Sequence, residues 1–237
     1  MNPYSVTDAG VPAAFADESA RAGFIRRTYT HLFGAVVALI ALEGALFGLV
    51  PKAKMQAFVQ GISPMYWLIA LVAFMGVSWL ARSWASNGGS RGKQYAGLGL
   101  YILAEAALLF PLLYVAVAYN EAIPLQAAII TLAIFGGLTA FVFMTGADFS
   151  GLGKYLALGG IAAMGAIFAG MIMGFSLGMW FSVAMVVLAA GYILYDTSNV
   201  LHHYQTQQHV AASLALFSSV VLLFWYVLRI LMAFAEE

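Results

Sequence analysis

Cysteine is absent from this chain of 237 residues, and only 8% of the residues are charged. Without cysteine, the chain forms no disulfide, holds no thiolate metal site and has no cysteine nucleophile. Ten basic residues balance ten acidic ones, and no basic run predicts a nucleic-acid partner. The sequence also lacks a Ser/His pair, an HExxH element or a GxGD element of an intramembrane hydrolase. We therefore expect no enzyme, no resident cofactor and no nucleic acid.

Long apolar runs dominate what is present. Hydrophobic residues make up 63% of the chain, and the mean hydropathy is +0.92. Several runs reach the roughly 20 residues that a helix needs to cross the bilayer. The sequence predicts an all-α membrane protein, a seven-transmembrane-helix bundle in a lipid bilayer with the last helix at its centre. The expected spans are His31–Val50, Met65–Trp84, Gln94–Tyr119, Pro124–Thr145, Tyr155–Met173, Met179–Tyr195 and a seventh from about His209.

The segment before the first span differs in composition. Residues 1–22 are polar and mixed, without the basic start and short apolar core of a signal peptide. We expect them to form a disordered cytoplasmic tail, and 23–237 to form the seven-helix transmembrane domain. Basic residues near short loops set orientation, and seven against three favour a cytoplasmic N-terminus. The seven are Arg21, Arg26, Arg27, Arg82, Arg91, Lys93 and Lys154, and the three are Lys52, Lys54 and Arg229. Short loops without glycosylation sequons favour a bacterial inner membrane.

The stretch GYILYDTSNV, 191–200, carries the least expected charge in the chain. Asp196 ends a nearly unbroken apolar run and has no positive residue near it in sequence. A carboxylate in such a place is costly, so it indicates a partner or a function. The helix after it is interrupted by Ser218 and Ser219 and carries one further charge, Arg229, before the terminal glutamates.

These residues resemble the Bax inhibitor-1 (transmembrane Bax-inhibitor-motif) family of membrane proteins. The match rests on the LYDT element of 194–197, on the frame of the last helix and on the turn TGADFSGLG, 145–153. It covers about residues 20–232. The family places a second aspartate on the last helix, and that position is Ser219 here. The residues that keep the frame of that helix are Leu216, Phe217, Leu223, Phe224, Leu228, Arg229 and Leu231.

The resemblance implies a pH-sensitive calcium leak controlled by two aspartates that share a site. Two such carboxylates titrate as a coupled pair and offer oxygen ligands to Ca²⁺. In this chain Asp196 keeps one half, as a possible Ca²⁺ ligand, and Ser219 supplies only a neutral hydroxyl across from it. We therefore expect a cation pathway, calcium or protons being the candidate ions, with weakened pH gating. Arg82 is expected to be the closed-state counter-ion, within about 4 Å of Asp196.

Two more acids lie inside predicted spans. At about 1.5 Å per residue, Glu43 lies about 24 Å inward from Arg27, and Glu105 lies about 18 Å inward from Lys93. Intramembrane glutamates are by default functional candidates that face the bundle interior. We assign both to the ion pathway or gate. The alternative is that each is protonated and hydrogen-bonded within the bundle.

Other interpretations stay open. Asp196 could cap the loop after its helix, and Arg82 could extend to the headgroups without meeting it. The histidines His202, His203 and His209 are expected on the surface. The spacings Gly44-x-x-x-Gly48 and Gly170-x-x-x-Gly174 predict close approach of helices. The alternative function is a non-conducting membrane regulator of stress, cell-death or membrane-protease machinery, acting through a membrane protein partner.

Overall fold

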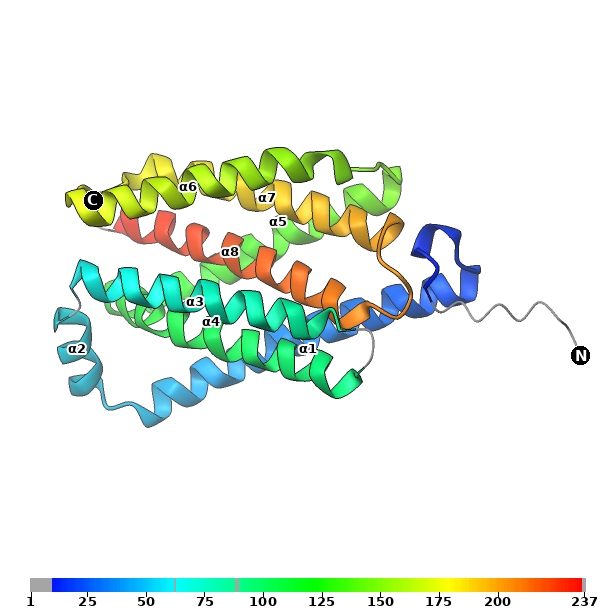
Figure 1. Ribbon diagram of the computed structural model, residues 1–237. Helices are drawn as coiled ribbons and strands as arrows, with labels where there is room; N and C mark the ends of the chain where they lie inside the picture. The colour runs from blue at the N-terminus through cyan, green and yellow to red at the C-terminus, as the bar shows by residue number, and fades with distance from the viewer. Residues whose placement is uncertain (1–9, 62, 88–89, 236–237) are drawn as a thin grey trace, which may run out of the picture.

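The computed structural model describes residues 10–61, 63–87 and 90–235, and this part of the chain is helical almost throughout. Apart from two 3₁₀ turns, α-helices account for all its elements (Figure 1). They are η1 (Ala13–Phe15), α1 (Glu18–Leu49), α2 (Lys52–Gly61), α3 (Pro64–Ala85), α4 (Arg91–Tyr119), α5 (Ile123–Thr145), η2 (Ser150–Leu152), α6 (Gly153–Met173), α7 (Gly178–His202) and α8 (His209–Ala235).

Seven helices of the described chain are long and apolar enough to cross a membrane. They are α1 and α3 to α8, which confirms the all-α class and the seven-helix prediction. The ten-residue helix α2 is too short to cross and turns aside between α1 and α3 (Figure 1). Successive spans run up and down the bundle, so α1 begins and α8 ends at opposite ends of it. We call the end at which α1 begins the N-terminal end.

The last helix is central, as predicted. Of its most apolar window, 61% is buried, against 11% for the span that contains α6. α8 packs against α1, α3, α4, α5 and α7, whereas α6 packs mainly against α7. Its apolar residues therefore face protein on nearly every side, and a polar residue on α8 must find its partner inside the bundle.

Two boundaries differ from the sequence-based expectation. Residues 1–9 of the expected disordered tail lie outside the described residues, but η1 and the first turn of α1 already precede Ala22. Ala13 is fully buried, and its N–H donates to the Tyr204 carbonyl at 2.8 Å, which anchors this segment on the α7–α8 loop. Helix α7 continues seven residues past Tyr195, because the polar side chains after it are buried against neighbouring segments.

Close helix packing occurs at glycines other than the expected ones. A Cβ on Gly97 would lie 2.5 Å from the Ala81 carbonyl oxygen, so α3 and α4 are in backbone contact there. By contrast, nothing lies within 4 Å of a Cβ on Gly44 or Gly48, and the prediction for that pair is wrong. Gly174 ends α6 with φ +75°, a conformation that glycine adopts without strain.

Candidate functional site

Asp196 lies within α7, six residues before its end. Its side chain is 8% exposed, and Oδ2 accepts a hydrogen bond of 2.5 Å from the hydroxyl of Ser219 on α8. This confirms the predicted contact between the two residues. The helix continues beyond Asp196, and its carboxylate is bonded to another helix, so the loop-cap interpretation does not describe its role. Helix α7 is thereby joined to the central helix α8 by a short, charge-assisted bond in the interior.

Arg82 lies near the end of α3, and its guanidinium turns toward α8. Nη2 donates to the hydroxyl of Ser218 at 2.7 Å, and the guanidinium carbon lies 5.7 Å from the centre of the Tyr101 ring. The predicted contact with Asp196 within 4 Å is wrong: among the described residues, the one ion pair within that distance is His203–Asp148. The Arg82 guanidinium bonds instead to Ser218, the neighbour of the serine that bonds Asp196. Arg82 remains within electrostatic range of Asp196.

A recess of about 180 Å³ opens beside these residues at the N-terminal end of the bundle. Its polar lining residues are Arg82, Ser86 and Tyr204. Burial and the nearby Asp196 charge raise the pKa of Tyr204 above its ordinary value, so its hydroxyl keeps its proton. The complete lining is Arg82, Ala85, Ser86, Tyr204, Ala211, Leu214 and Ala215. Arg82 therefore borders an open recess as well as the Ser218 hydroxyl.

The α5–α6 turn is tied to the end of α7 by Asp148. Oδ1 accepts from the Ser150 N–H at 2.8 Å and from the Ser198 hydroxyl at 3.1 Å, and Oδ2 lies 3.4 Å from His203 Nε2. Ser198 in turn accepts the Phe149 N–H at 2.8 Å. The Ser150 N–H is the main cause that holds the pKa of Asp148 well below its ordinary range. These contacts link the α5–α6 turn to the end of α7.

The two intramembrane glutamates have different surroundings. Glu105 on α4 is 7% exposed and lies within electrostatic range of Tyr101 and Arg82, which links it to the Asp196 region. Glu43 on α1 is 6% exposed, and neither of its oxygens has a hydrogen-bond partner. The hydrogen-bonded alternative therefore does not describe Glu43. The structure brings Asp196, Ser219 and Arg82 into one region, with Glu105 beside it, and leaves Glu43 apart.

Metal binding by histidine has no geometric support. Among the described residues, no three or more His, Cys, Asp or Glu side chains come together as a metal site. His203 is half exposed, as expected, and pairs with Asp148. His209 was expected on the surface, but its Nδ1 atom is buried. A divalent cation at Asp196 would need backbone, hydroxyl or water oxygens beside the single carboxylate.

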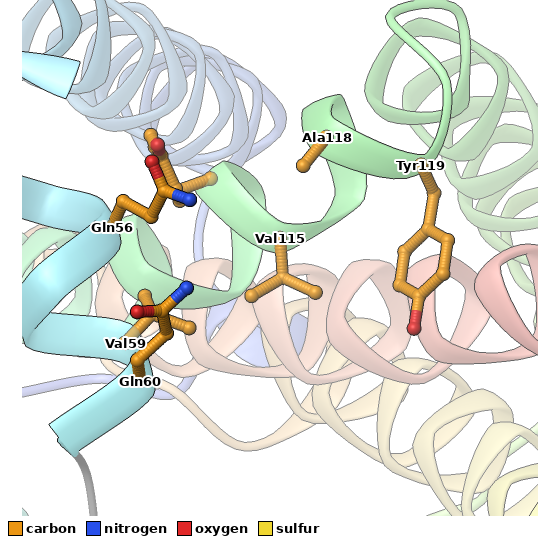
Figure 2. A pocket seen from close by; sticks show the side chains of 7 residues that line it. Gln56, Val59, Gln60, Val115, Ala118 and Tyr119 are labelled. Atoms are coloured by element: carbon orange, nitrogen blue, oxygen red, sulfur yellow. The ribbon is translucent and has the colours of Figure 1, made fainter. Parts of the chain in front are cut away.

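The opposite end of the bundle carries a different recess, of about 260 Å³, between α2 and α4. Figure 2 shows Gln56, Val59 and Gln60 of α2 facing Val115 and Tyr119 of α4 across it. Tyr114 also lines it and donates to the Lys52 carbonyl at 3.2 Å, which fixes the start of α2. Since its lining carries no charged side chain, this recess differs chemically from the one beside Arg82.

Sequence reasoning did not identify three members of the site: Ser218, Tyr204 and Ser198. Each is a common polar residue whose role comes from the helix opposite it. Ser218 was visible as a polar interruption in an apolar helix, and that was the one available signal. Tyr204 and Ser198 gave none, because the lengths of α7 and the following loop determine where they point.

Comparison with known proteins agrees with this geometry. The family described as "Inhibitor of apoptosis-promoting Bax1" matches residues 21–236. This chain belongs to the Bax inhibitor-1 family. It is 30% identical to "Bax inhibitor 1" of Schizosaccharomyces pombe over 226 residues, which are 93% of this chain and 80% of the relative. A "BI1-like protein" of Arabidopsis thaliana is also 30% identical, over 92% of this chain and 83% of the relative. The "Golgi anti-apoptotic protein" of vaccinia virus is 28% identical over 138 residues, 56% of this chain and 58% of the relative.

The family match covers the whole region around Asp196. The matched segment includes every residue of the Asp196 region, from Arg82 on α3 to Ser219 on α8. In this member of the Bax inhibitor-1 family, the aspartate expected on the last helix is a serine, and it still forms the inter-helix bond. The chain is thus an integral membrane protein of that family with one carboxylate at the α7–α8 contact.

Proposed function

We propose that this protein forms a cation leak pathway along the interior of its helix bundle, with calcium as the favoured ion. Asp196 is the gate or ligand residue, Ser219 is its neutral partner, and Arg82 is the counter-ion of the closed state. The observation that carries the proposal is the buried Asp196 carboxylate, which is bonded to the central helix and lies within electrostatic range of Arg82. Intramembrane acids of this kind mark ion pathways by default.

The hydrogen bonds support a closed arrangement. Arg82 on α3 and Asp196 on α7 both bond to adjacent serines of α8, so three helices meet at one turn of the central helix. Opening would require the guanidinium to leave Ser218 and move toward the recess at the N-terminal end. Removal of that cation would expose the negative Asp196 region to cations from the aqueous side.

The choice of calcium rests on family membership and on ligand chemistry. Carboxylate, hydroxyl and backbone oxygens are ligands that Ca²⁺ accepts in flexible geometry. A single aspartate shares no proton with a second carboxylate, so the pathway should respond weakly to pH near neutrality. Glu105 lies beside the same region and Glu43 lies farther along the bundle, and both would extend the pathway across the membrane.

The test is ion flux into liposomes that contain only the purified protein. Ca²⁺, Na⁺ and H⁺ entry are compared for wild type, Asp196→Asn and the matched control Asp17→Asn. The control makes the same chemical change at the same end of the bundle, at an exposed aspartate that precedes α1 and whose side chain makes no capping hydrogen bond. We expect Asp196→Asn to lower Ca²⁺ flux strongly and Asp17→Asn to preserve most of it. Equal flux in empty liposomes and in liposomes with wild type would reject the pathway.

A second candidate function is a non-conducting regulator that acts on a membrane protein partner. Two observations favour it: the serine in place of the second aspartate, and relatives whose names describe them as anti-apoptotic. Under this proposal the wild-type protein is silent in the flux assay. Site-specific cross-linking in cells should then yield a membrane protein in stoichiometric amount, and Arg82→Gln should change that yield without any effect on ion flux.

A further inference from the structure

A cluster of basic and aromatic side chains lies at the N-terminal end of the bundle, apart from Asp196. It consists of Arg27 and His31 on α1, Arg91 and Tyr95 on α4, and His209 at the start of α8. The His31 ring lies 4.9 Å from the His209 ring and 5.5 Å from the Tyr95 ring, measured between centroids. Arg27 and Arg91 both lie within electrostatic range of His209. We call this set the basic cluster.

Hydrogen bonds fix the orientation of the His31 ring. Nδ1 lies 2.7 Å from the Arg27 carbonyl, which can only accept, so Nδ1 carries a proton. Nε2 lies 3.1 Å from the Tyr95 hydroxyl, and in the neutral ring it accepts from that hydroxyl. His209 Nδ1 is buried. The cluster therefore holds ring nitrogens and a hydroxyl at set positions between three helices.

The positive charge of the cluster is not balanced locally. Among the described residues, no carboxylate lies within 4.0 Å of Arg27 or Arg91. Arg27 Nη2 donates to the Thr206 carbonyl at 3.3 Å, which leaves most of the five guanidinium donors for another acceptor. Helices α4 and α8 both begin here, and their N-terminal ends add partial positive charge (Figure 1).

The position of the cluster matches the edge of the bilayer. Arg27 and Arg91 are exposed, and the long apolar part of α1 begins immediately after His31. A guanidinium at that depth reaches the headgroup region, where phosphate groups lie. Arginine forks recognise phosphate by paired hydrogen bonds.

We propose that the basic cluster is a binding site for a phosphate group, supplied by an anionic lipid headgroup or by free phosphate. Arg27 and Arg91 supply the charge and paired donors, and His31, Tyr95 and His209 shape the floor between them. Occupancy joins α1, α4 and α8 at one end of the bundle. This site is independent of the ion pathway, because none of its five residues takes part in the Asp196 contacts.

The test measures lipid retention by native mass spectrometry of the detergent-purified protein. Phosphatidate and phosphatidylcholine are titrated against wild type and the double variant Arg27→Gln/Arg91→Gln. The matched control is Arg26→Gln/Lys93→Gln, which removes two exposed positive charges from the same two helices. We expect the cluster variant to bind phosphatidate about 30-fold more weakly, because it loses both guanidinium groups that bond the phosphate directly, at about fivefold each. The control should stay within about threefold of wild type.

Competition identifies the source of the phosphate. Displacement of phosphatidate by excess inorganic phosphate indicates a site for the free ion, and retention indicates a lipid site. If the double variant does not elute as one species, Arg91→Gln alone replaces it, with an expected loss of about fivefold. Equal losses in both double variants, or equal binding of phosphatidate and phosphatidylcholine by wild type, would overturn the proposal.

Discussion

Asp196 and Glu43 occupy matching positions at opposite ends of the bundle. Each lies six residues before the end of its helix, about 9 Å inward, and each is more than nine-tenths buried. Asp196 has a hydroxyl donor at 2.5 Å, whereas neither oxygen of Glu43 has a partner. A buried carboxylate without a donor needs a proton or a cation to balance it. A hydrogen bond therefore fixes Asp196 at the N-terminal end, whereas Glu43 at the opposite end is available to bind a proton or a cation.

The same contrast appears in helix packing. Gly97 lies toward the N-terminal end and is in backbone contact with α3, whereas Gly44 lies in the other half beside open space. Asp148 adds a further tie at the N-terminal end. The interlocked end is suited to hold a closed state, and the looser end is suited to admit an ion or a proton. Four experiments can break or sharpen this comparison.

The largest effect is expected from a second carboxylate at the interlocked end. In the variant Ser219→Asp, two aspartates share the α7–α8 contact and titrate as a coupled pair. Ca²⁺ flux into liposomes should then change about tenfold or more between pH 6 and 8, against less than about twofold for wild type. The change Asp196→Asn in the same variant should abolish the response. A wild-type flux that already switches sharply in this window contradicts the account and directs attention to Glu43 and Glu105.

The second-largest effect is expected from a change in the packing between α3 and α4. In Gly97→Ala the added Cβ meets the Ala81 carbonyl and the Ala85 N–H, so α3 and α4 must separate. We expect a loss of about 1–3 kcal/mol in the free energy of unfolding, measured by denaturant titration in detergent. The control Gly44→Ala should be neutral or stabilising by up to about 1 kcal/mol, because alanine favours the helix and meets nothing. Equal losses would remove the contrast in packing.

Removal of one hydroxyl tests the contrast between the two acids. Ser219→Ala leaves the buried Asp196 carboxylate without its donor and should cost about 1–3 kcal/mol in the same titration. Glu43→Gln removes no hydrogen bond that the structure contains, so we expect a smaller loss than for Ser219→Ala. A larger loss for Glu43→Gln than for Ser219→Ala would show that Glu43 has a partner of its own.

Sequence patterns predicted the elements better than the contacts. Hydropathy located all seven spans, because a membrane helix must be long and apolar whatever surrounds it. The family resemblance located Asp196 and Ser219, and the structure joins them. The prediction of a direct Arg82–Asp196 ion pair was wrong. The depth of Arg82 in its span does not reveal that Ser218, on another helix, accepts a hydrogen bond from it.

The prediction of close helix packing from the spacing of Gly44 and Gly48 was wrong for a related reason. The Gly44-x-x-x-Gly48 pattern indicates only that one face of the helix carries small residues. Close packing also requires a second helix against that face. Gly97 has no such pattern and makes the close contact. The sequence places the end of α7 too early because it treats Asp196 as a polar stop, whereas the Asp196 carboxylate and the Ser198 hydroxyl are hydrogen-bonded to other segments.

The smallest effect concerns acid sensitivity at the α5–α6 turn. The folded pKa of Asp148 lies below its ordinary value, chiefly because the Ser150 N–H bonds the carboxylate. Its contribution to stability is therefore complete above the ordinary pKa near 4 and is lost as the pH falls toward the folded pKa. Because Asp148 is half exposed, solvent screens much of the interaction. Asp148→Asn should slightly lower the unfolding temperature at pH 7 and make it fall less between pH 5 and 3 than in wild type.

The control for this measurement is Glu121→Gln, at an exposed carboxylate in the turn between α4 and α5 at the opposite end. Every other carboxylate titrates equally in both variants, so the difference between the two acid slopes isolates Asp148. The Glu121 variant should follow wild type through the whole range. If the Asp148 variant loses stability toward pH 3 as steeply as wild type, the carboxylate does not hold the turn on α7. The interlocking of the N-terminal end would then rest on the bonds to α8 and on the α3–α4 contact.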